Sequence, residues 1–310
     1  MPLGRNLTEY IGRTPLVRLN KYRAALGFSS QMCAKLEYFN PTGSCCDRAA
    51  FALLEDARER GILKPGDCVI EACMGNMGIS LAFMGMQFGC KVLLVVPENA
   101  NIYKVRQMRA YGAQVVFSDR EQGIFGAIEK AKQLWSQIKN AYMPRQFEND
   151  AAVEVHRKTT GPEILGDLDN ELDAFVCCVG TGATLSGAGE FIKGWVPEVK
   201  IIAVEPAESP VLSGGSPAPH SMDGIGVGFI PENFNPYIVD EVARVSTGDA
   251  MQAARTVALL EGIPCGVTGG AALFAATEFA HRMPDSTLRI VVLLNDSSER
   301  YLNTSLYPQL

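Results

Sequence analysis

The sequence predicts an α/β fold of two lobes, each built on a largely parallel sheet that is covered by helices. Three observations predict it. Apolar runs alternate with helical stretches, the runs are rich in β-branched residues without polar alternation, and both halves of the chain show the pattern. Strands without polar alternation are typical of parallel sheets buried on both faces. The 310 residues suffice for two modest domains. We therefore expect a cleft between two lobes, with ligands at the carboxyl ends of the strands.

In the first half, three apolar runs indicate neighbouring strands. They lie at residues 68–72, 91–97 and 114–117, and helical patterns at 79–88 and 102–111 separate them. The middle run has no polar residue after its first lysine, which favours a strand buried on both faces.

The second half repeats this order. Apolar runs at 174–179, 200–204 and 288–294 indicate strands, and a helix is predicted to begin near Leu185. The regular alternation of strands and helices, with no low-complexity linker, supports parallel sheets rather than an all-β or all-α fold.

Composition and charge exclude several classes of function. The formal net charge of -6 argues against a nucleic-acid-binding surface. No apolar run reaches the roughly 18 residues needed to span a bilayer, and the N-terminus lacks the basic and apolar regions of a signal peptide. We therefore expect a cytoplasmic protein that binds neither nucleic acid nor membrane. The nine cysteines show no Cys-x-x-Cys spacing, and the three histidines stand far apart. These spacings predict no metal site.

Four glycine-rich segments follow apolar runs or connect elements, at residues 75–78, 180–184, 224–228 and 266–270. The segment 180–184 lies between a predicted buried strand and a predicted helix. Small residues there allow backbone N–H groups to converge, and a helix N-terminus adds partial positive charge, so this loop could bind an anion. It matches neither the dinucleotide-binding fingerprint nor the P-loop. Each of the other three is, alone, more often a turn than a site.

Taken together, five segments resemble the cysteine synthase (O-acetylserine sulfhydrylase) family, pyridoxal-phosphate enzymes of fold type II. They are residues 11–19, 35–44, 180–184, 205–215 and 298–302, within a match that runs from about Gly12 to Tyr307. The resemblance implies a two-lobed architecture like that of the tryptophan synthase β subunit, with the cofactor between the lobes. It implies a smaller lobe at 41–145, a larger lobe formed by 1–40 and 146–310, and a homodimer.

The resemblance also implies roles for individual residues. Asn76 would bond the ring hydroxyl oxygen of the cofactor, Thr268 would contact its pyridine nitrogen, and Gln146 would help to bind the substrate carboxylate. The cofactor phosphate would be held by Gly180, Thr181, Gly182, Ala183 and Thr184.

The chain departs from the family pattern at position 46. The family has an aliphatic residue followed by Lys-Asp-Arg, where this chain has Cys45-Cys46-Asp47-Arg48. The family lysine forms the imine with the cofactor and moves the Cα proton. A thiol does neither, and the loss of proton transfer alone lowers a rate by ~10²–10⁴-fold. The resemblance then implies no intact catalytic residue, with Cys46 in the place of the lysine. We expect no covalent pyridoxal phosphate, while non-covalent pyridoxal phosphate or another phosphate or anion remains open.

The substrate loop departs as well. The family has Thr-Ser-Gly-Asn-Thr-Gly where this chain has Cys73, Met74, Gly75, Asn76, Met77 and Gly78, so three hydroxyl side chains are replaced. The two methionines either fill an unused pocket or line a new apolar one. Likewise, Cys46 is either a reactive thiol or a small residue left after the lysine was lost. We favour the second, because no histidine is placed by the sequence to lower the pKa of its thiol.

These observations suggest a cysteine-synthase-like protein, in the context of sulfur and cysteine metabolism, that is inactive as a pyridoxal-phosphate-dependent cysteine synthase. It would act by binding a small anionic ligand in the cleft or a protein partner through it, since such clefts can accept a partner's C-terminal carboxylate. Two alternatives stay open. One is an enzyme of altered chemistry that uses Cys46 or a non-covalently held cofactor. The other is a cysteine synthase, forming cysteine from O-acetylserine and sulfide, that a Lys-to-Cys change has inactivated.

Overall fold

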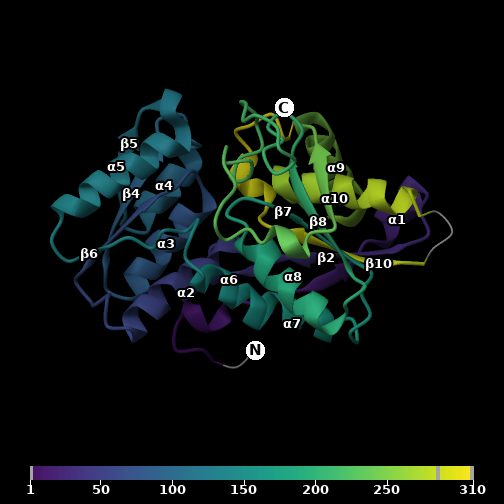
Figure 1. Ribbon diagram of the computed structural model, residues 1–310, viewed down its shortest axis with the longest axis horizontal. Coiled ribbons are helices and arrows are strands. Elements are labelled where there is room, and N and C mark those ends of the chain that lie inside the picture. Colours follow the sequence, from purple (N-terminus) through teal and green to yellow (C-terminus); the bar gives the residue numbers. More distant parts are fainter. Residues whose placement is uncertain (1–2, 284–286, 308–310) are drawn as a thin grey trace.

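The structure is a computed structural model that describes residues 3–283 and 287–307. The chain forms the predicted α/β architecture, with one six-stranded and one four-stranded sheet. Figure 1 shows the sheets as two lobes, with β3 to β6 on one side of the molecule and the larger sheet on the other. No helix in these two ranges is long and apolar enough to cross a membrane.

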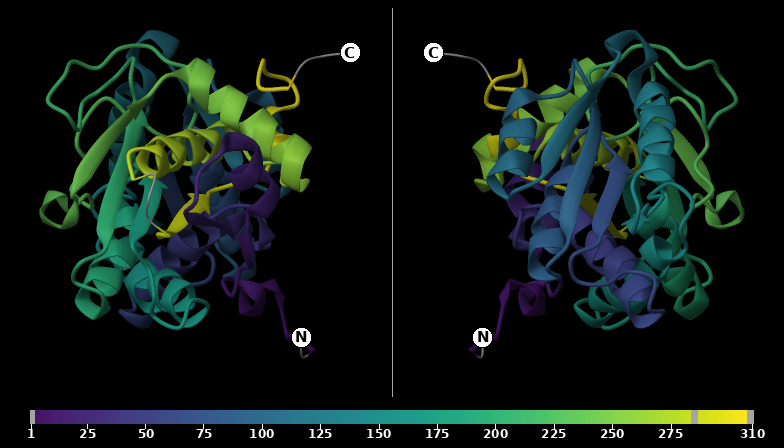
Figure 2. Two further views of the ribbon diagram at one scale, coloured as in Figure 1. Left: turned by 90° about the vertical axis from the view of Figure 1, so that its right-hand side faces the viewer. Right: turned by 90° about the vertical axis from the view of Figure 1, so that its left-hand side faces the viewer.

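The smaller sheet is wholly parallel, in the order β5-β4-β3-β6. Its strands are β3 (Cys68–Ala72), β4 (Lys91–Pro97), β5 (Gln114–Ser118) and β6 (Ala141–Tyr142). Its helices are α2 (Cys46–Glu59), α3 (Asn76–Gln87), α4 (Ile102–Ala110) and α5 (Gly123–Gln137). Alternate residues of β4 face opposite layers: Val92, Leu94 and Val96 pack with α2 and α3, whereas Leu93 and Val95 pack with α5. Both faces of this sheet are therefore buried, and Figure 2 shows helices on either side of it.

The larger sheet has the order β1-β2-β10-β7-β8-β9, and only the β1–β2 pair is antiparallel. Its strands are β1 (Leu16–Arg18), β2 (Gln31–Leu36), β7 (Ala174–Cys178), β8 (Lys200–Pro206), β9 (Glu241–Val245) and β10 (Arg289–Leu294). Its helices are α1 (Asn20–Leu26), α6 (Ala151–Val155), α7 (Gly161–Gly166), α8 (Ala183–Trp195), α9 (Thr247–Glu261) and α10 (Val267–His281). Alternate residues of β10 pack against α9 and α10 on one face and against α7 and α8 on the other.

The predicted strands are confirmed to within two residues at each end. The helix predicted at 79–88 begins three residues earlier, at Asn76, because the glycine-rich loop itself forms the first turn of α3. Gly78 allows this close packing, since a Cβ at that position would lie 2.3 Å from Sγ of Cys73. The strands of the smaller sheet fall within the predicted 41–145 lobe, and the lobe boundaries themselves stay a prediction.

Candidate functional site

A cleft lies where β3, β7 and β10 end, between the two sheets. The loop after each strand contributes to its lining, which is the position expected for a ligand site in such folds. The structure brings together nearly all of the predicted site residues. Those that line the cleft are Cys46, Met74, Gly75, Asn76, Met77, Gln146, Gly180, Thr181, Gly182, Ala183, Thr184 and Thr268. Cys73 differs, because it is buried in the core of the smaller lobe beneath the loop.

The predicted phosphate site is a turn that requires glycine at two positions. Gly182 precedes α8 with a φ of 83°, and a Cβ there would lie 2.7 Å from the Cα of Phe234. A Cβ on Gly180 would lie 2.3 Å from the carbonyl oxygen of Gly224. Ala183 is the first residue of α8 and is buried, so its methyl group fits a helical backbone. Backbone N–H groups at a helix N-terminus form a site suited to a phosphate group.

His156 lies behind this turn and contacts one of its threonines. Its Nε2 is 3.1 Å from Oγ1 of Thr184, and its Nδ1 is 2.8 Å from Oγ1 of Thr160. Burial, followed by the nearby Arg48 guanidinium, lowers the pKa of His156 to about 3. The imidazole is therefore neutral near pH 7, and its two ring nitrogens contact the hydroxyl groups of Thr160 and Thr184.

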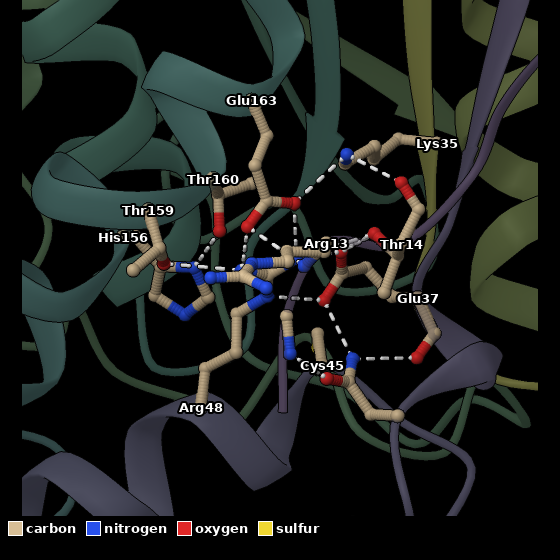
Figure 3. Close-up of polar contacts among 12 residues, drawn as sticks. Arg13, Thr14, Lys35, Glu37, Cys45, Arg48, His156, Thr159, Thr160 and Glu163 are labelled. Carbon is tan, nitrogen blue, oxygen red and sulfur yellow. Dashed lines mark hydrogen bonds and ion pairs between the residues drawn. The ribbon is translucent and has the colours of Figure 1, made fainter. Parts of the chain in front are cut away.

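A buried ion network supports the same end of the cleft (Figure 3). Arg48 donates to both carboxylate oxygens of Glu37 at 2.8 Å and to Glu163 at 2.6 and 2.8 Å. Lys35 pairs with Glu163 at 2.9 Å. Burial would raise the pKa of Glu163, but Arg48 and Lys35 outweigh burial and lower it to about 2. The network ties α2 to β2 and α7, and so joins the segments on which the cleft is built.

On the opposite side of the cleft, Cys46 is the first residue of α2 and is only partly buried. Cys45 lies beneath it, and its backbone N–H donates to the carbonyl of Asn295 at 3.0 Å. A hydrogen bond to Cys46, followed by burial, raises the pKa of the Cys45 thiol. Burial also raises the pKa of the Cys73 thiol. Both buried cysteines therefore stay protonated near pH 7.

The side-chain amides of two residues that were predicted to bind a ligand already donate hydrogen bonds within the protein. Nδ2 of Asn76 donates to Oδ2 of Asp296 at 2.7 Å, and Nε2 of Gln146 donates to the carbonyl of Ala72 at 2.6 Å. The backbone N–H of Gln146 donates to Glu71, a buried residue at the end of β3. Burial raises the pKa of Glu71 to about 7, even though backbone N–H groups oppose that shift.

Sequence reasoning missed a second polar group at the cleft. Nζ of Lys104, which is buried in α4, donates to Oδ2 of Asp223 at 2.6 Å and lies 4.7 Å from the ring centre of Tyr301. The Tyr301 hydroxyl donates to Asp296 at 2.7 Å. Asp223 and Asn295 line the cleft. Of the residues in this group, the sequence pointed to Tyr301, which lies in the segment 298–302 that resembles the family.

The chain resembles known proteins over nearly its whole length. Residues 7–296 match the family described as pyridoxal-phosphate-dependent enzyme. The probable cysteine synthase of Bacillus subtilis (strain 168) is 44% identical over 306 residues, which cover 97% of each protein. The cysteine synthase of Staphylococcus aureus (strain N315) is 42% identical over 303 residues, or 97% of this chain and 96% of the relative.

Solved structures agree with this match. A cysteine synthase from Entamoeba histolytica has a TM-score of 0.94 at 37% identity, covering 99% of this chain and 91% of that chain. O-ureido-L-serine synthase has a TM-score of 0.94 at 34% identity, covering 98% of this chain and 95% of that chain. The fold of this protein is therefore that of fold type II pyridoxal-phosphate enzymes.

The expectation of no covalent pyridoxal phosphate, with a non-covalent cofactor or another anion in its place, is wrong. The matched family is pyridoxal-phosphate-dependent and normally holds this cofactor covalently, and the similarity extends over residues 7–296 without any sign of cofactor loss. The expectation depended on one side chain, that of Cys46. The residues at 180–184 fit the cofactor's phosphate, because they line the cleft at the N-terminus of α8, where backbone N–H groups suit an anion.

Proposed function

This chain belongs to the cysteine synthase family of pyridoxal-phosphate-dependent enzymes, and we propose that it is a member that acts by binding rather than by forming cysteine. In this proposal the cleft keeps the cofactor phosphate site and has lost the side chains that turn over an amino-acid substrate. The protein then serves sulfur and cysteine metabolism as a binding component.

One observation carries the proposal: among the described residues that line the cleft, none is a lysine. The titratable groups there are three cysteine thiols, one imidazole and the carboxylate of Asp223. The pKa of His156 is lowered to about 3 by burial and by Arg48, and the pKa of Cys45 is raised. A general base works best when its pKa lies near the operating pH, and neither of these two groups meets that condition.

The chain offers a place for the cofactor's phosphate at residues 180–184, with Thr268 and Asn76 along the same cleft. When bound, pyridoxal phosphate supplies an electron sink for a carbanion. Thr184 holds its hydroxyl toward His156, which fixes its rotamer. Met74 and Met77 line the side of the cleft formed by the loop 73–78, here called the loop side, and bring no hydrogen-bond donors. A substrate carboxylate therefore meets fewer partners there than hydroxyl side chains would provide.

The test measures cysteine formation from O-acetylserine and sulfide, with pyridoxal phosphate added, for this protein and for the relative from Bacillus subtilis. We expect this protein to be slower by at least ~10²-fold, the lower end of what removal of a proton-transfer group does. Binding of pyridoxal phosphate, followed by its absorbance during titration, is expected to be saturable. A rate of cysteine formation that equals the relative's would overturn the proposal.

Three further features belong to this proposal. We propose a homodimer and a cytoplasmic protein whose cleft can admit a segment of a protein partner. Analytical ultracentrifugation at micromolar concentration tests the first: a mass twice that of the 33.5 kDa chain is expected, and a monomer would contradict it.

A further inference from the structure

The loop side of the cleft is poor in side-chain donors. The amide nitrogen of Asn76 already donates a hydrogen bond to Asp296, and that of Gln146 donates one to the carbonyl of Ala72. A carboxylate can only accept hydrogen bonds, so the bond to Asp296 fixes which way the Asn76 amide is turned. Met74 and Met77 offer only thioether sulfurs, which are weak acceptors. A ligand carboxylate on this side would therefore depend on backbone N–H groups.

The same side is rich in acceptors. Oδ1 of Asn76 and Oδ1 of Asn295 are both buried and have no hydrogen-bond partner among the described residues, and both side chains line the cleft. They come from opposite lobes, at the start of α3 and directly after β10. A buried carbonyl oxygen without a partner is unfavourable, and a donor on a ligand would satisfy it.

Asp223 adds negative charge at this place. Its Oδ2 accepts from Lys104, while its Oδ1 lies 3.6 Å from where a Cβ on Gly75 would be. Among the described residues that line the cleft, Asp223 is the only acidic residue, and none is a lysine or an arginine. Asp296 accepts a hydrogen bond from Asn76, so this part of the cleft has two carboxylates, those of Asp223 and Asp296, and the ammonium of Lys104. The N-terminus of α3 favours a nearby negative charge, and Asp223 already supplies it.

We propose that the wall formed by Asn76, Asn295 and Asp223 binds the ammonium group of a ligand and disfavours a carboxylate. This inference deepens the binding function proposed above by naming the ligand class for one side of that cleft. An ammonium N–H donates to an acceptor of this wall, and its positive charge pairs with Asp223. A carboxylate would instead meet a like charge and two carbonyl oxygens that repel it.

The test compares N,N-dimethylglycinamide and N,N-dimethylglycine, which share the ammonium group and differ in having a neutral amide or a carboxylate. Both are tertiary ammonium compounds, so neither forms an imine with pyridoxal phosphate. Binding to the protein loaded with pyridoxal phosphate and freed of excess is measured by calorimetric titration at pH 7. We expect the amide to bind about tenfold more tightly, a difference of 1.4 kcal/mol. Equal or tighter binding of dimethylglycine overturns the inference.

Absence of binding by both probes also contradicts the inference, and it leaves the cofactor titration and the cysteine assay of the previous section unaffected. Asp223→Asn is expected to reduce the tenfold preference to about twofold or less, whereas Asp169→Asn, on the exposed surface, is expected to leave it unchanged.

Asp223→Asn also leaves Lys104 without its ion-pair partner, which lowers stability. A second variant therefore tests the same wall without breaking an ion pair. Asn295→Ala removes one acceptor and breaks no ion pair, and we expect it to weaken binding of the amide about fivefold. Unchanged binding of the amide to a folded Asn295→Ala protein contradicts the role of this wall.

Discussion

The two sides of the cleft differ in what they are made of. The phosphate side is a turn of backbone at residues 180–184, held by glycines that have no room for a Cβ and supported from behind by the ion network around Arg48. The loop side depends on the side chains of Cys46, Met74 and Met77. A backbone site survives most substitutions, whereas a side-chain site changes with each one. In the proposal above, the chain therefore keeps the turn at 180–184 for a phosphate group, while the loop at 73–78 carries Cys73, Met74 and Met77 in place of hydroxyl side chains.

The largest expected effect comes from rebuilding the loop side. The combined variant Cys46→Lys, Cys73→Thr, Met74→Ser and Met77→Thr restores an amine and three hydroxyl groups at once. We expect it to form cysteine from O-acetylserine and sulfide at least ~10²-fold faster than the unchanged chain. Cys46→Lys alone is the matched control and should recover much less. Equal rates for the two variants would show that the loop substitutions do not matter.

The support behind the phosphate side can be broken at Arg48. Arg48→Met leaves Glu37 buried without its partner, so we expect a loss of about 3–5 kcal/mol in the free energy of unfolding. The control is Arg157→Met, whose side chain is 34% exposed and pairs with Glu154 and Glu190 at the surface. That change should cost at most about 1 kcal/mol. Urea unfolding measures the free energy of unfolding of both variants. Similar losses would mean that the buried network contributes no more to stability than the surface ion pairs do.

The phosphate turn itself can be broken at Gly182. Gly182→Ala combines a left-handed backbone with a clash against Phe234, and we expect a loss of about 3–4 kcal/mol together with weaker binding of pyridoxal phosphate. Gly214 is a matched control, since its φ of 82° is nearly the same and a Cβ there would meet nothing within 4 Å. Gly214→Ala should cost about 1–2 kcal/mol. Thermal unfolding with and without the cofactor distinguishes the two contributions.

The buried carboxyl group of Glu71 supports the loop side, and it makes the stability of the folded chain depend on pH. The pKa of Glu71 is raised from 4.5 to about 7 by burial, so the folded state binds this proton more tightly than the unfolded state. Its contribution to stability is present below pH 4.5 and is lost as the pH rises to about 7, by up to about 3 kcal/mol. Glu71→Gln should remove this slope, while Glu148→Gln should keep it. Urea unfolding at pH 5 and pH 7.5 provides the measurement.

The sequence predicts the strands and the phosphate turn because both are local. Residues 91–97 carry an apolar run long enough to exclude other structures, and residues 180–184 place glycines directly between a strand and a helix. The helix α10 gives no such signal, since it is buried along most of its length and shows no polar face.

The polar wall of the cleft could not be predicted in the same way. Lys104 and Asp223 are 119 residues apart in the chain, and Asn76 and Asp296 are 220 residues apart. No local pattern marks residues that meet only after both sheets have formed. The cofactor expectation failed for the opposite reason, because one conspicuous residue, Cys46, was given more weight than the similarity of the whole chain.

The order of strands in the larger sheet has a consequence for synthesis on the ribosome. β2 is among the first strands to emerge, yet its parallel neighbour is β10, the last strand among the described residues, which lies between β2 and β7. The strands of the smaller sheet all lie between residues 68 and 142 and pair only with one another. The smaller sheet can therefore assemble while translation continues, whereas β2 keeps one edge open until residues 289–294 have been made.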